Sequence, residues 1–157
     1  MKKLYALILL LSVCYVQAQV IFSENMGAGS GTIAIASNTF QNGAPIVFSG
    51  DADTRVTTPS TGYTGASGLR NVFFAGAGDR FFRIDGINTS AYSTANLQLS
   101  FGYLTTTVSA QMVVEVSTDN GDNWSPLTFT NNTSTSWNLV TITSGIPSSA
   151  SLSLRFT

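Results

Sequence analysis

The segment Asn96-Leu97-Gln98-Leu99-Ser100-Phe101-Gly102-Tyr103 decides the fold class, because apolar and polar residues alternate along it. Alternation places successive side chains on opposite faces of a β-strand, whereas an amphipathic helix repeats about every 3.6 residues. Every second residue from Leu97 to Tyr103 therefore shares one face, which we expect to point into a core while the other face meets water. The segment predicts one strand of an antiparallel sheet.

The same alternation recurs on both sides of this segment. Two clear cases are residues 111–117 and 151–156, and weaker candidates are residues 20–23, 32–36, 45–48, 71–75, 80–84, 126–129 and 137–143. Good helix formers are scarce after residue 19, and Gly, Ser, Thr and Asn interrupt the chain every few residues. About ten short strands with frequent turns predict an all-β fold, an antiparallel β-sandwich of the jelly-roll kind.

The N-terminal segment has the composition of a secretory signal peptide. Two lysines follow the initiating Met, residues 4–13 form an apolar run, and Val16-Gln17-Ala18 has the pattern of a cleavage site. The run is shorter than the roughly 20 apolar residues that a transmembrane helix needs. We therefore expect residues 1–18 to be a signal-peptide helix that is removed. Residues 19–157 would then form one domain, secreted or at the cell surface, with no membrane span after cleavage.

Two other interpretations of this segment stay open. In the first, the segment is retained as a short membrane anchor. In the second, the protein is a lipoprotein whose Cys14 is lipidated after cleavage. A lipoprotein signal normally has Gly or Ala where Val13 stands, so cleavage after Ala18 is the favoured prediction.

Composition narrows the chemistry that is open to the secreted part. Residues 19–157 carry five arginines, no lysine and eight carboxylates, which gives a formal net charge of −3. A nucleic-acid partner is therefore not expected, because binding a phosphate backbone needs clustered cations. The chain has no histidine, and Cys14 is its only cysteine. After cleavage the chain would therefore lack the residues for a histidine-based triad, a thiol nucleophile, a Schiff-base lysine or a cysteine metal site.

A long polar stretch, residues 49–68, is the first candidate ligand site. Its Gly, Ser and Thr content predicts a loop, and such long loops in compact domains are usually functional or disordered. Tyr63 lies in it, and Arg70 and Asn71 follow it. An exposed ring can stack on a sugar, and planar side chains can hydrogen-bond to its hydroxyls. These three residues are the predicted ligand-binding positions.

A second candidate is a cation site. Glu24 follows the first predicted strand, and Asp51 and Asp53 lie in the long loop. Calcium takes several oxygen ligands from carboxylates and carbonyls, so a structural calcium ion is the one cofactor that these residues suggest. The sequence shows no complete ligand set, and solvated turn carboxylates are the simpler alternative.

One turn matches a known pattern. Ser117-Thr118-Asp119-Asn120-Gly121-Asp122-Asn123-Trp124 fits S-x-D-x-G-x-x-W and resembles the Asp-box, a hairpin motif of sialidase propellers and many other secreted β proteins. Asp119 can accept turn amide hydrogens, Gly121 permits a positive φ, and Trp124 opens the next strand. Sialidases carry several copies, whereas only one stands here. We therefore predict a structural turn made by Ser117, Asp119, Gly121 and Trp124.

Four stretches together carry a family resemblance. They are Val20-Ile21-Phe22-Ser23-Glu24-Asn25-Met26-Gly27, Asp79-Arg80-Phe81-Phe82-Arg83-Ile84-Asp85-Gly86-Ile87-Asn88-Thr89-Ser90, Leu97-Gln98-Leu99-Ser100-Phe101-Gly102, and Val114-Glu115-Val116-Ser117-Thr118-Asp119 with Trp124. They are similar to jelly-roll-like β-sandwich accessory modules of secreted Bacteroidota proteins exported by the type IX secretion system. Such modules usually precede other domains, sometimes a nuclease or protease, and a sorting domain often follows. The resemblance implies a non-catalytic accessory module.

The chain departs from this family at its C-terminus. Family members continue into at least one more strand, whereas this chain stops in mid-alternation at Leu154-Arg155-Phe156-Thr157. We expect a fragment that is cut inside or just after a strand. A natural final strand is the alternative.

The predicted function is a secreted or cell-surface binding or adhesion module, not an enzyme. Glycans are the leading ligand class, and cell-surface components are the expected partners. One alternative is part of a secreted hydrolase, either a nuclease or a glycosidase that uses paired carboxylates such as Glu115 and Asp119. The other is a purely structural spacer.

Overall fold

The computed structural model describes residues 19–76, 80–107 and 111–157. Within these ranges the chain forms ten strands, two 3-10 helices and no α-helix. The predicted signal peptide, the lipidation alternative at Cys14, and Asp79 of the family resemblance lie outside the described residues. No helix in the described ranges is long and apolar enough to cross a membrane.

The elements are short and are joined by turns and loops. The strands are β1 (Ile33–Ala34), β2 (Val47–Gly50), β3 (Asp53–Arg55), β4 (Asn71–Phe73), β5 (Phe82–Ile87), β6 (Leu99–Tyr103), β7 (Val114–Ser117), β8 (Ser125–Pro126), β9 (Asn138–Ile142) and β10 (Leu152–Phe156). The helices are η1 (Ile35–Ser37) and η2 (Thr94–Asn96).

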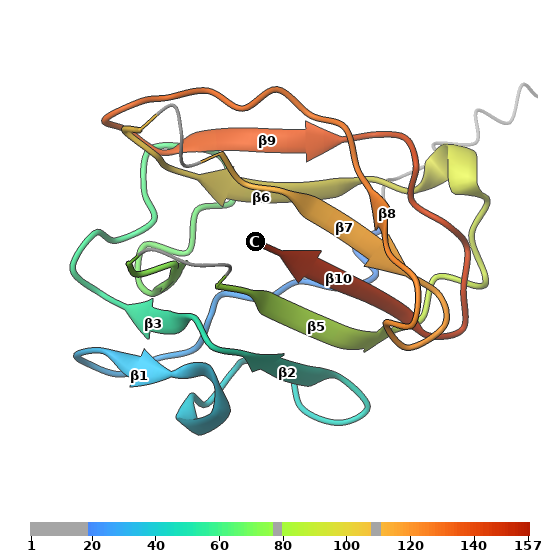
Figure 1. Cartoon of the computed structure of the whole chain (residues 1–157), viewed down its shortest axis with the longest axis horizontal. Coiled ribbons are helices and arrows are strands. Elements are labelled where there is room, and N and C mark those ends of the chain that lie inside the picture. Colours follow the sequence, from blue (N-terminus) through green and yellow to red (C-terminus); the bar gives the residue numbers. More distant parts are fainter. Residues whose placement is uncertain (1–18, 77–79, 108–110) are drawn as a thin grey trace, which may run out of the picture.

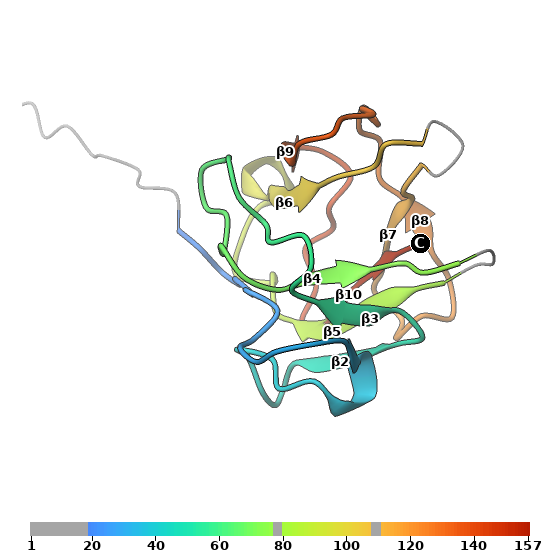
Figure 2. The same ribbon diagram turned by 90° about the vertical axis from the view of Figure 1, so that its left-hand side faces the viewer.

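The strands form three sheets, and every pairing is antiparallel. The largest sheet has the order β2-β5-β10-β7-β8, a second has the order β1-β3-β4, and β6 pairs with β9 (Figure 1). β10 is central in the largest sheet, because it pairs with β5 on one side and β7 on the other. In Figure 2 the β6–β9 pair lies above β5, β10 and β2. The predicted all-β, antiparallel class is confirmed.

The predicted inner faces of the clearest strands are also confirmed. The alternating apolar residues in and next to β6, β7 and β10 point inward, and the buried ones are Leu97, Tyr103, Val114, Val116, Leu152, Leu154 and Phe156. Aromatic rings connect the sheets across this core. Phe156 of β10 packs edge-on against Phe101 of β6, with ring centres 5.4 Å apart, and Phe82 of β5 contacts Phe156 from within its own sheet.

A bulge in β5 breaks the alternation at Gly86. Leu152 of β10 pairs with Ile87 and Leu154 pairs with Ile84, so β5 contains one more residue than its partner over this step. Gly86 takes up the extra residue with φ 88°. Ile84 and Ile87 would face opposite sides of a regular strand, but the bulge turns both into the core. The prediction that this strand ends at residue 84 is wrong for this reason.

Two other boundary predictions are wrong. Residues 20–23 form no strand, and the predicted loop 49–68 contains the end of β2 and all of β3. β3 pairs with β1 and β4, and its central residue, Thr54, is 0% exposed. The buried member of this strand is polar, so hydrophobic alternation did not reveal it. The loop that remains is residues 56–70.

Candidate functional site

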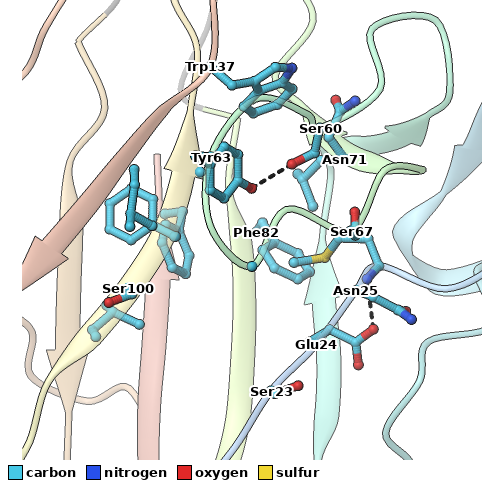
Figure 3. Close-up of a pocket in the computed structure, with 18 of the residues that line it drawn as sticks. Ser23, Glu24, Asn25, Ser60, Tyr63, Ser67, Asn71, Phe82, Ser100 and Trp137 are labelled. Atoms are coloured by element: carbon cyan, nitrogen blue, oxygen red, sulfur yellow. Dashed lines mark hydrogen bonds between the residues drawn. The ribbon is translucent and has the colours of Figure 1, made fainter.

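All three predicted ligand-binding residues line one cavity of about 340 Å³ (Figure 3). Its inner wall is largely apolar and is formed by side chains of β4, β5, β6 and β10. Its rim comes from residues 22–26 and from the loop 56–70. Figure 3 shows Tyr63 and Trp137 toward one end of the cavity and Glu24 toward the other. Tyr63, Arg70, Asn71 and Glu24 therefore line one hollow, although they come from three segments.

Tyr63 is held in place at this rim. Its hydroxyl lies 2.5 Å from the Ser60 hydroxyl oxygen, and its side chain lies against Gly102 of β6. A Cβ at position 102 would overlap the tyrosine ring and hydroxyl. The glycine in β6 is therefore what makes room for Tyr63.

Arg70 and Asn71 are buried, and most of their donors are used inside the protein. Arg70 is 1% exposed, and its Nη2 donates to the carbonyl and hydroxyl oxygens of Thr54 at 2.9 and 2.7 Å. Nδ2 of Asn71 donates to the Thr58 carbonyl at 2.7 Å. The Arg70 bonds tie the end of the loop 56–70 to β3, and the Asn71 bond ties the loop to β4. They leave few donors for a sugar, and the role of both residues in ligand binding stays a prediction.

The three predicted metal ligands do not form one cluster. Three main-chain amides and one asparagine side chain donate hydrogen bonds to the Glu24 carboxylate. Asp51 forms an ion pair with Arg80, and Asp53 forms one with Arg55. The described part of the chain contains no group of three or more His, Cys, Asp or Glu that could hold a metal ion. A calcium site stays a prediction.

The turn after β7 is built around Ser117 and Asp119. The Ser117 hydroxyl donates to Oδ1 of Asp119 at 2.6 Å and accepts from the amide of Gly121, whose φ is 90°. Asn123 donates to Asp119 with its main-chain amide at 3.0 Å and its side chain at 2.7 Å. These donors favour the ionised carboxylate. The Ser117 hydroxyl first, and then Asn123, hold the pKa of Asp119 well below its usual range.

Asp119→Asn is expected to destabilise the protein at neutral pH by an amount that shrinks in acid. The pKa of Asp119 is lowered on folding, so the carboxylate stabilises the fold above its unfolded pKa of about 4. That stabilisation is lost as the pH falls from about 4 toward the lower folded value. Urea unfolding of wild type and variant between pH 7 and pH 3 measures the difference. Asp122→Asn is the matched control, because no side-chain hydrogen bond of Asp122 occurs within the described ranges, and a pH-independent Asp119 effect would contradict the prediction.

A second hollow, of about 460 Å³, lies on the face of the five-stranded sheet that points away from the core. We call it the Trp124 groove, and its lining residues are Phe81, Arg83, Glu115, Gly121, Trp124, Arg155 and Thr157. Arg155 of β10 pairs in register with Arg83 of β5 and with Glu115 of β7, so the three stand in one row across the sheet. The guanidinium carbons of Arg155 and Arg83 lie 4.3 and 5.3 Å from the centre of the Trp124 ring.

Each arginine of the Trp124 groove is paired with one carboxylate, and some of its hydrogen-bonding groups remain unpaired. Arg155 donates to Oε2 of Glu115 from Nε at 2.8 Å and lies 2.7 Å from it at Nη2. Arg83 donates from Nε to Oδ1 of Asp85 at 2.8 Å and from Nη2 to the Asn120 carbonyl at 2.7 Å. Among the described residues, Nη1 of each arginine and Oε1 of Glu115 have no hydrogen-bond partner. The row thus offers two guanidinium donor groups and one carboxylate acceptor beside one indole ring.

Sequence reasoning assigned Trp124 to a turn and missed this groove. The available signal was the set of charged residues at the outward positions of three alternating strands, Arg83, Glu115 and Arg155. Only the strand order shows that these positions are neighbours, because the strands are far apart in the chain.

Comparisons with known proteins add no relative: no protein-family model, curated protein or solved structure matches the chain. A function is therefore inferred from the geometry of the two hollows. The fold class that the structure shows is all-β with antiparallel sheets.

Proposed function

We propose that the protein is a secreted or cell-surface glycan-binding module without catalytic activity, and that the Trp124 groove holds the sugar. The observation that carries the proposal is the row Arg83–Arg155–Glu115 beside Trp124. Three neighbouring strands of one sheet position this row, so its groups are held on a rigid surface.

A neutral saccharide fits the chemistry of this groove. A sugar ring has an apolar C–H face, which suits an indole that is only partly buried, as Trp124 is. Its neighbouring hydroxyls both donate and accept, which suits a groove that offers both guanidinium donors and a carboxylate acceptor. Two arginines are balanced here by Glu115 and Asp85, and a phosphate backbone would require an excess of cations.

The hydrolase alternative has less support. A glycosidase needs one carboxyl group that stays protonated to act as the general acid. Glu115 is ion-paired with Arg155, and the turn donors lower the pKa of Asp119 instead of raising it. Asp119 therefore lacks the environment of a proton donor at neutral pH, and the carboxylate of Glu115 is engaged by Arg155.

The proposed setting is an accessory module of the Bacteroidota type IX kind with a jelly-roll-like sandwich fold. Support comes from the antiparallel sheets, from the aromatic contact between β6 and β10, and from the signal-peptide composition of residues 1–18. The composition of residues 1–18 supports export, and the antiparallel sheets and the aromatic contact support the fold part of the proposal.

Arg155→Gln is expected to weaken glycan binding at least tenfold. The change removes a charged donor and its contact with Trp124, and a hydrogen bond to a charged group contributes about 1.5–3 kcal/mol. A glycan array identifies a neutral oligosaccharide, and calorimetric titration of that sugar gives Kd for each protein. Arg55→Gln is the matched control, because Arg55 pairs with Asp53 and stacks on Phe73 at 3.9 Å but lies outside the groove.

The same titration separates the alternatives. Equal losses in the Arg155 and Arg55 variants would contradict the assignment to the groove. Loss of binding in Tyr63→Ala, with wild-type affinity in Arg155→Gln, would move the sugar to the cavity rim. Hydrolysis of array glycans would indicate the hydrolase, and neither binding nor hydrolysis would indicate a spacer.

A further inference from the structure

Phe81 is an aromatic residue that the core does not use. It is half-buried, and among the described phenylalanines only Phe81 and the exposed Phe73 neither belong to the core nor pack against it. The next residue, Phe82, is buried in the core, so the alternation of a strand places Phe81 on the opposite face of the sheet. The Trp124 groove lies on that face, and Phe81 lines it.

Phe81 and Trp124 border the groove at separate places. No ring contact joins Phe81 to Trp124 or to any other aromatic residue of the described chain, whereas Trp124 lies against Arg155 and Arg83. Phe81 precedes Arg83 by two residues, which corresponds to about 7 Å in an extended strand. The groove therefore has two aromatic surfaces, one beside the two arginines and one about 7 Å further along the strand direction.

A hydroxyl group lies next to the second aromatic surface. The pairing of Phe156 with Phe82 brings Thr157 opposite Phe81, and Thr157 also lines the groove. The main-chain amide and carbonyl of Thr157 are bonded to Val113, while its side-chain hydroxyl has no hydrogen-bond partner among the described residues. This end of the groove thus offers an apolar ring and a hydroxyl, which are groups that a neutral sugar can use.

We propose that the Trp124 groove binds a linear neutral oligosaccharide of at least two sugar units, with the first unit at Trp124 and the second at Phe81. This inference rests on the proposed glycan-binding function and specifies the ligand of the same site. A step of about 7 Å is comparable with the length of one hexose unit in a linear chain, so consecutive sugar rings would reach both aromatic side chains. The groove volume, about 460 Å³, is larger than one hexose ring fills.

A comparison of one and two sugar units tests for the second position. The probes are the terminal disaccharide of the neutral glycan that the array identifies and the methyl glycosides of its two component sugars, each titrated calorimetrically against the protein. The disaccharide is expected to bind at least tenfold more tightly than either methyl glycoside. Equal affinities for one and two units would overturn the proposal and leave the glycan-binding function in place, whereas no binding of any probe would overturn both.

Variants locate the second position. Phe81→Ala is expected to weaken disaccharide binding at least fivefold and to leave binding of the methyl glycosides unchanged, because only the second sugar would contact this ring. Phe81→Tyr retains an aromatic ring and is expected to keep the wild-type preference for the disaccharide. Phe73→Ala is the matched control, since Phe73 also lies outside the core and is not part of the groove, and it is expected to bind every probe as the wild type does.

Two results with these variants would overturn the proposal. Equal weakening of the disaccharide and the methyl glycosides in Phe81→Ala would place Phe81 at the first sugar. Equal losses in the Phe81 and Phe73 variants would show that the ring has no specific role in the groove. Circular dichroism checks that each variant is folded, and the comparison of one and two units on the wild type still decides if Phe81→Ala does not fold.

Discussion

Phe82→Ala is expected to lower the free energy of unfolding by about 3–5 kcal/mol. Phe82 is 3% exposed, and its ring neighbours are Phe40, Phe48 and Phe156. Truncation removes the ring that contacts all three and leaves a void in the core against β5. Small domains have a total stability of about 5–15 kcal/mol, so this one change removes a large share of it.

Urea denaturation and thermal melting of wild type and variant measure this loss. We expect the melting temperature to fall by about 10–20 °C for a domain of this length. Phe73→Ala is the matched control, because Phe73 is 41% exposed and contacts Arg55 at the surface. That control is expected to lose about 1 kcal/mol or less. Similar losses in the two variants would contradict the placement of Phe82 in the core.

Gly86→Ala is expected to destabilise the protein more than alanine does at a glycine in an open loop. Gly86 has φ 88°, and a Cβ there would overlap the Pro45 carbonyl oxygen, which is main chain and cannot rotate away. Gly62→Ala is its control, with φ 82° and no atom near the position of the added Cβ. Both variants carry the cost of a left-handed alanine, about 1–2 kcal/mol, and only Gly86→Ala adds the collision.

Chemical denaturation of both variants gives the part of the loss that is due to the collision. We expect the Gly86 variant to lose at least twice the free energy of unfolding that the Gly62 variant loses. It is also expected to weaken glycan binding, because the bulge lies next to Asp85, which holds Arg83 in the groove. Equal losses in the two variants would contradict the collision between a Cβ at position 86 and the Pro45 carbonyl oxygen.

The fold was predictable where burial follows hydrophobicity. In the strand ending at Tyr103 and the strand 152–156, the alternating apolar residues are buried or half-buried, as the pattern predicted. β3 was missed because its buried residue is Thr54, which is stabilised by hydrogen bonds that alternation does not report. The end of β5 was missed because a bulge shifts the period at Gly86.

The candidate sites were predictable only where their residues are close together in the sequence. Tyr63, Arg70 and Asn71 share one cavity because they belong to the same loop and the strand that it enters. The burial of Arg70 was not predictable from its residue type, since arginine is mostly exposed in folded proteins. The Trp124 groove depends on which strands are neighbours, and that information lies in pairings between distant segments.

The central position of β10 has a consequence for how the molecule assembles. β5 and β7 do not pair with each other. The strand between them, β10, pairs with residues as distant in the chain as Phe82 is from Phe156. A chain emerging from a ribosome delivers both neighbours before it delivers β10. Until residues 152–156 insert, the sheet exists as two halves with two unpaired edges, which are templates for association with other chains. Completion of the sheet is therefore a late, long-range step. We expect the chain to be most prone to aggregation before β10 has inserted between β5 and β7.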